Sequence, residues 1–179
     1  MSVIFLLIRK EDMNKNKQFA KKRIMFIQKE DYNFLAYNLL LLLNEMDCVS
    51  EAKKFRDFRR IAYLIEFISG SADIENYKTY ELSNIYLRAQ LKKKLLSHLL
   101  ITLKNKDYIG ISLNTTHRTL DIWINKENIP NDFFDQEYFK REILNIKKIK
   151  FFSNITKAQQ LKNLVNDLYT TKGVLTWEI

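Results

Sequence analysis

The sequence predicts a mainly α-helical protein with one small β-hairpin, and three observations support this fold class. Glycine occurs three times and proline once in 179 residues, a scarcity that disfavours a many-turned β-sandwich and suits long helices. Apolar residues recur at spacings of three and four along most of the chain, which is the helical period. The stretch YIGISLNTTHRTLDIWIN at 108–125 instead alternates apolar and polar residues around a polar tip, which predicts two antiparallel strands.

Residues 1–30 are predicted to form an N-terminal, partly flexible segment. An apolar start, VIFLLI, precedes the polar and non-periodic stretch KEDMNKNKQFAKKR at 10–23. The apolar start is far shorter than the roughly 20 residues of a membrane helix, and its charges follow it, the reverse of a signal peptide. We therefore expect no membrane as a partner.

Two helices are predicted after this segment. Asp31 can cap a helix over 32–46, which is apolar nearly all round and should therefore be buried centrally. Ser50 can cap a second helix that extends to about Ser69. The side of that helix opposite its apolar face is expected to carry four basic residues, Lys53, Arg56, Arg59 and Arg60.

A long third helix is predicted from about Thr79, directly before the hairpin. Its inner stripe is expected to comprise Ile85, Leu91, Leu95, Leu99 and Leu103, widened by Leu96 and Leu100. The hairpin strands then alternate, with Ile109, Ile111 and Leu113 on one strand and Leu120, Ile122 and Ile124 on the other. The tip, from Asn114 to Thr119, is too long for a two-residue turn.

Three helices followed by a two-stranded hairpin are the order of the winged helix, a variant of the helix-turn-helix unit. We therefore expect a winged-helix domain over 31–127. A C-terminal helical extension is expected over 128–179, with one helix starting at Asp132 or Asp135. Thr156 and Gln159 match a capping box for a last helix, and GVLTWEI is expected to close the chain as a short strand.

The chain has a net charge of +9 and a pI near 9.5, which makes an acidic partner plausible, such as nucleic acid or an acidic protein face. However, lysine and asparagine are abundant while alanine, glycine and proline are few. This composition is typical of AT-rich coding bias, which places lysines on any solvated face. The charge alone therefore does not identify the partner.

The motifs of common active sites are missing from the sequence. Glycines stand only at 70, 110 and 173, which excludes both common glycine-rich phosphate loops. Cys48, the single cysteine, is far in sequence from His98, expected on a partly buried helix face, and from His117 at the hairpin tip. Neither metal-ligand nor nucleophile spacing appears, so we predict no catalytic residue, cofactor or metal. A lone cysteine also indicates a reducing, cytoplasmic location.

The third helix decides whether the domain reads DNA sequence, because a winged helix of that kind places the early residues of this helix at base edges. Here those residues are YELSNIYLRAQ, in which Glu81 is repelled by phosphate and Arg88 alone is basic. A sequence-specific reader is thereby disfavoured, although Asn84 and Gln90 match adenine contacts. The predicted contacts with a partner protein or DNA are Arg56, Arg59, Arg60, Lys92, Lys93, Lys94, His117 and Arg118.

The stretch KKFRDFRR sets Phe55 and Phe58 among arginines. Aromatic and arginine side chains are enriched at the centres of protein interfaces. The same pattern also fits core phenylalanines beside solvated arginines, and the sequence favours neither interpretation.

The passage EAKKFRDFRRIAYLIEFISG, preceded by NLLLLLNEM and followed by a long helix and a hairpin, resembles the middle components of ABC-type three-component defence systems. Lamassu is the best-known set, and the chain resembles its small subunit over roughly residues 35–127. The resemblance rests on a pattern of hydrophobic residues that basic residues interrupt. The chain departs from many such proteins in its low glycine content and in the segment before Asp31.

The resemblance implies a non-enzymatic accessory subunit of bacterial anti-phage or anti-plasmid immunity. Such a subunit would bridge an SMC-like ATPase, which has a coiled coil, to an effector nuclease, with a basic surface available to double-stranded DNA. The alternative is a free-standing winged-helix regulator that binds DNA. A small toxin or nuclease subunit is a third possibility, and it would depend on His98, His117 or Glu81.

Overall fold

The computed structural model describes residues 32–135, 137–152 and 157–177. The chain divides into a unit of residues 1–34 and a unit of residues 35–179. The second unit holds all the elements described below, apart from the first three residues of the first helix. The predicted N-terminal segment and the proposed caps Asp31 and Thr156 lie outside the described residues.

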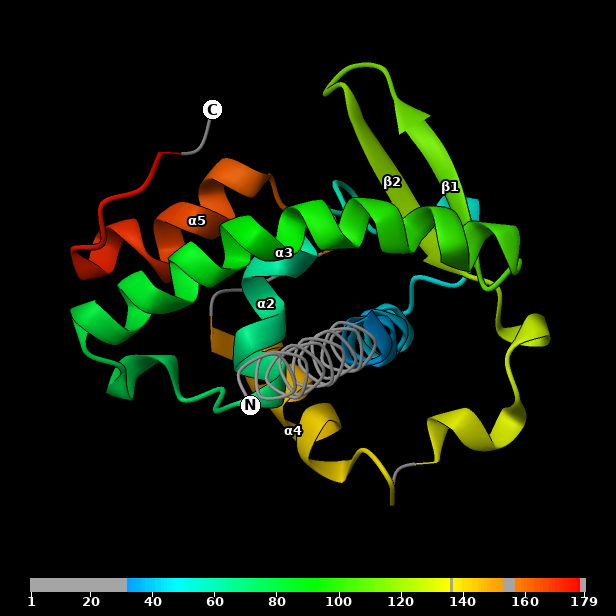
Figure 1. Ribbon diagram of the computed structural model, residues 1–179, viewed down its shortest axis with the longest axis horizontal. Coiled ribbons are helices and arrows are strands. Elements are labelled where there is room, and N and C mark those ends of the chain that lie inside the picture. The colour runs from blue at the N-terminus through cyan, green and yellow to red at the C-terminus, as the bar shows by residue number, and fades with distance from the viewer. Residues whose placement is uncertain (1–31, 136, 153–156, 178–179) are drawn as a thin grey trace, which may run out of the picture. The chain divides into compact units, whose positions relative to one another are not determined.

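The described chain is mainly helical and carries one two-stranded antiparallel sheet, as predicted (Figure 1). A first helix covers residues 32–45. The longer elements that follow are α2 (Arg60–Ser69), α3 (Thr79–Asn105), β1 (Ile109–Asn114), β2 (Thr119–Ile124), α4 (Lys140–Phe152) and α5 (Leu161–Leu168). Short 3-10 turns lie between them at Glu51–Lys53, Ile74–Asn76, Lys126–Asn128, Asn131–Phe134 and Thr170–Lys172.

The hairpin confirms the alternation predicted from the sequence. The apolar residues of its two strands pair directly, as Ile109 with Ile124, Ile111 with Ile122, and Leu113 with Leu120. Residues 115–118 form the tip, where Arg118 adopts a left-handed backbone with φ 50°. Apolar side chains at matched positions fix the register, because a slip by one residue would turn every one of them to the other face.

The second helix begins at Arg60, nine residues later than a cap at Ser50 predicts. The Ser50 side chain makes no capping hydrogen bond. The chain at Phe55 is extended instead, and its N–H and C=O exchange hydrogen bonds of 2.7 and 3.0 Å with Ile122 of β2. Because the hairpin supplies these partners, the backbone near Phe55 is satisfied outside a helix, and the local helical pattern is overridden.

The core lies around α2, eight of whose ten residues are buried. Tyr63 of α2, Tyr86 of α3 and Tyr169 after α5 form a ring cluster, with centroid distances of 5.3 to 5.9 Å. The Tyr169 hydroxyl donates to the Tyr63 carbonyl at 3.1 Å, and burial raises the pKa of Tyr169 well above its usual value. This cluster joins three helices from distant parts of the chain.

The predicted inner stripe of α3 is correct only in part. Leu91 is 72% exposed and Leu95 is half-buried. Leu91 lies two residues beyond the buried Ala89, which places it on the opposite side of a helix. The buried residues of α3 are Leu82, Ile85, Tyr86, Ala89, Leu96, Leu99, Leu100 and Leu103.

Both C-terminal helices form, but each starts later than expected. The α4 helix begins at Lys140 rather than at Asp132 or Asp135, because the Asp135 carboxylate accepts from the Glu137 N–H in a local turn. Of the apolar positions Phe139, Ile143, Ile146 and Ile149 that keep the helical period, the three isoleucines are buried, whereas Phe139 precedes the helix and is half-buried.

The last helix, α5, begins at Leu161, and Gln159 does not cap it. The Gln159 Nε2 donates instead to Asp167 Oδ2 at 3.1 Å. Residues 174–177 form no strand, so the predicted closing strand is wrong for this part of the chain.

Candidate functional site

A pocket of about 300 Å³ lies between the hairpin, the segment before α2, and the start of α5. We call it the hairpin pocket. In Figure 1, the hairpin and α5 both lie above α3. The pocket is lined by Arg56, Asp57, Arg59, Asn114, His117, Thr119, Ala158, Gln159, Gln160, Leu161 and Lys162. It therefore brings together three of the residues predicted as contacts, which are Arg56, Arg59 and His117.

Asp121 of β2 does not line this pocket but holds two of its lining residues, Asp57 and Asn114, in place. Its side chain is fully buried, and its two oxygens accept from the Asp57 N–H at 3.1 Å and from Asn114 Nδ2 at 3.2 Å. Lys54 Nζ lies 3.4 Å from the same carboxylate. These bonds hold Asp57 in a left-handed backbone with φ 56°, which turns the chain sharply into α2 and sets the neighbouring arginines at the pocket.

Arg59 and Arg56 differ in how freely they can meet a ligand. Arg59 makes a two-pronged ion pair with Asp57, at 2.8 and 2.7 Å, a geometry that fixes a guanidinium firmly. The Arg56 side chain is exposed. The pocket thus holds one anchored and one accessible arginine.

Arg60 does not lie on a solvent face, so its predicted position is wrong. Arg60 is fully buried, and its Nη1 atom donates to the carbonyls of Arg56 and Lys157 at 3.1 and 3.2 Å. The guanidinium lies 4.5 Å from the centroid of the Phe55 ring, and burial lowers its pKa to about 10. The late start of α2 explains the error, because Arg60 is the first residue of the helix and points back toward the segment that precedes it.

The three consecutive lysines of α3 do not form one solvated patch. Lys92 pairs with Glu66 of α2, and Arg88 joins the same carboxylate at 3.4 Å. The Lys93 Nζ lies 4.7 Å from the centre of the Tyr63 ring, and its pKa falls to about 8, chiefly through burial. Only Lys94 is exposed among the three. Most of this predicted patch therefore serves packing between α2 and α3.

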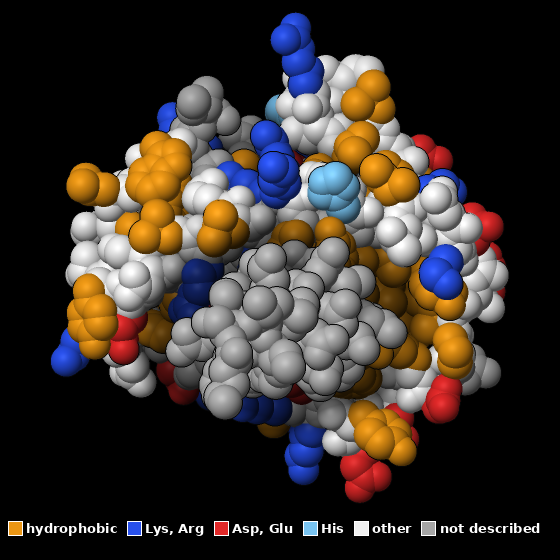
Figure 2. Space-filling view, viewed as in Figure 1, with side chains coloured by type: hydrophobic (Ala, Val, Ile, Leu, Met, Phe, Trp, Pro, Cys, Tyr) orange, Lys and Arg blue, Asp and Glu red, His pale blue; other side chains and the backbone are white. Residues whose placement is uncertain are grey.

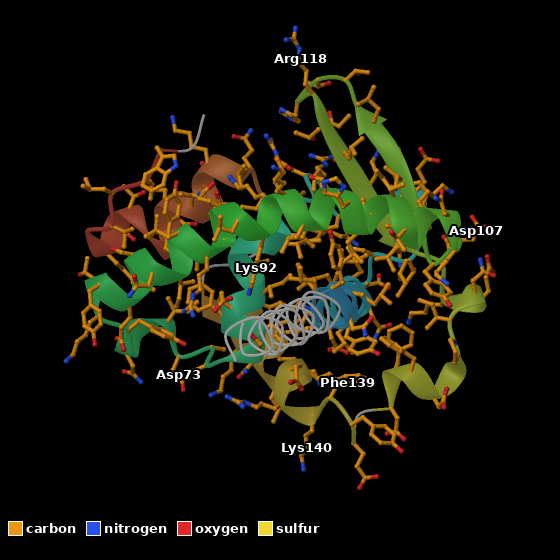
Figure 3. The ribbon with its side chains drawn as sticks, viewed as in Figure 1. Asp73, Lys92, Asp107, Arg118, Phe139 and Lys140 are labelled. Carbon is orange, nitrogen blue, oxygen red and sulfur yellow. The ribbon has the colours of Figure 1, made fainter. Side chains whose placement is uncertain are left out.

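Arg118 lies at the hairpin tip, where Figure 3 shows its side chain directed away from the body of the protein. His117 is exposed, and its N–H donates to Asn114 Oδ1 at 3.2 Å. His98, which was expected to be partly buried, is exposed on α3. Figure 2 shows basic and histidine side chains between the hairpin and the apolar residues on the left of the view.

A second surface, which the sequence did not reveal, follows the outer side of α3. We call it the outer seam. Its members are all exposed and recur at alternating spacings of four and three: Tyr80, Asn84, Leu87, Leu91, Lys94, His98 and Ile101. The apolar tail residues Leu175 and Trp177 are also exposed, and together with Leu87 they line a shallow hollow. The seam could not be recognised from the sequence because α3 carries apolar residues on both of its faces, so their spacing does not distinguish the buried face from the exposed one.

Within residues 32–135, 137–152 and 157–177, no three His, Cys, Asp or Glu side chains gather as they would around a metal ion. Cys48 is buried, and burial raises the pKa of its thiol to about 11, so its thiolate is scarce near neutral pH. No helix in the described part of the chain combines the length and the apolar character needed to cross a membrane.

Comparison with known proteins identifies no relative. No protein-family model, no curated protein and no solved structure matches the chain.

Proposed function

We propose that the chain is a non-catalytic accessory subunit of a bacterial anti-phage or anti-plasmid defence complex, and that it acts in the cytoplasm. In this proposal residues 31–127 form a winged-helix core. The order of three helices and a hairpin supports it, as does the isolated antiparallel bridge between Phe55 and Ile122 on the outer side of β2. The subunit bridges an SMC-like coiled-coil ATPase to an effector nuclease.

The outer seam is the observation that carries this proposal. Residues spaced alternately by four and three line one face of a helix, and this spacing is the a and d pattern of helices that pack side by side. Leu87 is 49% exposed and Leu91 is 72% exposed. An apolar row left open to water is typical of a surface that binds another protein.

The length and chemistry of α3 favour a helical partner. Its 27 residues span about 40 Å, which is enough for several turns of contact with a coiled coil. Asn84, Lys94 and His98 interrupt the apolar row, and polar residues at such positions fix register rather than add affinity. The resemblance described above supplies such a partner, the coiled coil of an SMC-like ATPase.

Co-expression with the ATPase and the effector encoded in the same gene cluster tests the proposal. The tagged chain should retain the ATPase in a pull-down, whereas the double variant Leu87→Glu with Leu91→Glu should lose it. Each new carboxylate would be desolvated in the seam. Leu144→Glu is the matched control, because Leu144 is a half-exposed leucine on α4, outside the seam.

If the chain binds none of the proteins that are encoded beside it, the proposal is overturned. Retention of the ATPase by the double variant would instead remove the seam as the contact surface.

The hairpin pocket favours a second candidate, a free-standing regulator that binds DNA. Arg56, Arg59 and Lys162 bring three cations to the pocket against the single carboxylate of Asp57. Duplex DNA should then bind with an affinity that falls steeply as salt rises, because neutralised phosphates release counterions. A gel-shift assay at about 50 mM salt that shows no complex would exclude this candidate.

A further inference from the structure

The start of α5 lines the hairpin pocket through Gln160, Leu161 and Lys162. The first hydrogen bond of the α-helical pattern at this end of α5 runs from the Leu164 N–H to the Gln160 carbonyl, and Gln160 makes no capping bond with its side chain. The N–H groups of Leu161, Lys162 and Asn163 precede that bond. Unpaired N–H groups and the positive end of the helix dipole attract an anion.

Thr119 gives a second and independent indication of a ligand. The residue is 7% exposed, lines the pocket, and its hydroxyl has no hydrogen-bond partner. Thr119 lies two residues before Asp121 on β2, so both side chains lie on one face of the hairpin. Asp121 on that face contacts the N–H of Asp57, so the Thr119 side chain is directed toward the same side, where the pocket lies.

A buried hydroxyl without a partner is costly, and a phosphate oxygen in the pocket would accept its proton. Gln159 lines the same pocket, and its Oε1 is also buried without a donor. A ligand that carries a hydroxyl group or a protonated phosphate oxygen would supply that donor.

The charges of the pocket select an anion over a neutral ligand. Arg56 and Lys162 are exposed at its rim, and Arg59 is fixed by Asp57 in its wall. Since Arg59 neutralises the only carboxylate among the lining residues, the charges of Arg56 and Lys162 remain for a ligand. The volume of about 300 Å³ is at the small end of ligand sites, which suits a single phosphate group with part of its ester.

We propose that the hairpin pocket binds a phosphate group, either of a small phosphate ester or of a nucleic-acid backbone. The ligand oxygens accept from the first N–H groups of α5 and from Thr119, while Arg56 and Lys162 close over them. This site goes beyond the accessory role proposed above, because contact with an ATPase along the outer seam requires no phosphate.

Titration of the isotopically labelled full chain, followed by amide NMR, tests this site. Inorganic phosphate should shift the amide signals of Leu161, Lys162 and Asn163 more than sodium chloride does at equal ionic strength. The double variant Arg56→Gln with Lys162→Gln should weaken the binding by roughly tenfold or more, since it removes two charge-assisted contacts. Thr119→Val keeps the side-chain shape and should also weaken binding.

Lys104→Gln with Lys106→Gln is the matched control. It removes two exposed lysine charges at the end of α3 that lie outside the outer seam and are absent from the pocket lining, so it should leave phosphate affinity unchanged. Both residues altered in the pocket double variant are exposed as well, so its fold should be kept even if Thr119→Val is unstable.

A parallel titration with a short DNA duplex separates the two sources. If the three α5 amides shift with inorganic phosphate but not with the duplex, the ligand is a small phosphate ester. If they shift with the duplex at a lower concentration of phosphate groups than inorganic phosphate requires, the ligand is a nucleic-acid backbone. Equal responses to phosphate and chloride, or binding unaffected by the pocket double variant, would overturn the site. The pull-down through the outer seam is read independently, so failure of either proposal leaves the other interpretable.

Discussion

At the scale of single residues, Gly110 shows how a close contact dictates residue type. Gly110 pairs with Trp123 across the hairpin, and a Cβ atom built at Gly110 would lie 2.0 Å from the indole ring. Any side chain there must therefore push the ring aside. The requirement comes from the partner strand, since the backbone at Gly110 does not have the positive φ found at Gly173.

We expect Gly110→Ala to lower the free energy of unfolding by ~1–3 kcal/mol, the usual cost of overpacking. Urea unfolding measures this loss. In a Trp123→Ala background the same change should cost much less, because the obstructing ring is gone. Equal costs in the two backgrounds would show that the two residues do not interact.

Lys93 is predicted to make stability depend on pH. Burial, followed by the nearby charge of Arg59, lowers its pKa from 10.5 to about 8. Between these values the unfolded chain binds a proton that the folded chain has released, so the free energy of unfolding rises with pH. Lys93→Met removes this contribution, and the native protein should therefore gain stability relative to the variant between pH 8 and pH 10.

Urea unfolding of both proteins at several pH values measures this difference. The raised pKa of Cys48 acts in the opposite direction above pH 9, but it is common to both proteins and cancels in the comparison. Parallel stability curves for the two proteins would contradict the assignment.

At the scale of elements, the hairpin could be predicted and the start of α2 could not. The alternation of Ile109, Ile111 and Leu113 is a local pattern, and its period of two is specific to a strand. The backbone partner of Phe55 is Ile122, which lies on a strand that comes much later in the sequence. No window around Phe55 contains that information, and the helical pattern after it was therefore extended too far toward the N-terminus.

Part of the candidate site could likewise be predicted from the sequence, and part could not. Arg56, Arg59 and His117 were recognised from residue type, but their meeting in one pocket depends on where α5 begins. Lys162 was missed because the capping-box pattern placed that start several residues too early. The outer seam was missed because Leu91 was assigned to the wrong side of α3.

Asp121 is expected to hold the hairpin to the segment that precedes α2. Asp121→Ala would leave the buried Asp57 N–H without its acceptor, at a cost of roughly 1–3 kcal/mol, and would also remove the acceptor of the half-buried Asn114 amide. Amide hydrogen exchange at Asp57 should accelerate together with the loss of stability in urea. Asp73→Ala is the control, since Asp73 forms an exposed pair with Lys148, a kind that contributes little. Unchanged exchange at Asp57 would refute this role of Asp121.

At the scale of the whole molecule, residues 35–179 behave as one compact unit. Ile143, Ile146 and Ile149 of α4 are buried, and α4 and α5 both pack against α2. The central helix therefore depends on residues from both the predicted core and the predicted extension.

A chain that ends at residue 127 should therefore fail to unfold cooperatively and should bind a hydrophobic dye, because the apolar faces of α2 would meet water. Heat unfolding followed by circular dichroism measures the cooperativity. A chain that ends at residue 174 keeps both C-terminal helices, and it should unfold in a single transition. A sharp transition in the shorter chain would show that the core is self-sufficient.

The buried Arg60 has a consequence for how related sequences diverge. Both acceptors of its Nη1 atom are main-chain carbonyls, those of residues 56 and 157, and every amino acid supplies such a carbonyl. Substitution at either position leaves the acceptors in place, whereas no other side chain offers the planar donors of arginine at residue 60. A distant homologue should therefore keep an arginine at the first position of this helix, whereas the side chains at residues 56 and 157 can change without loss of these two hydrogen bonds.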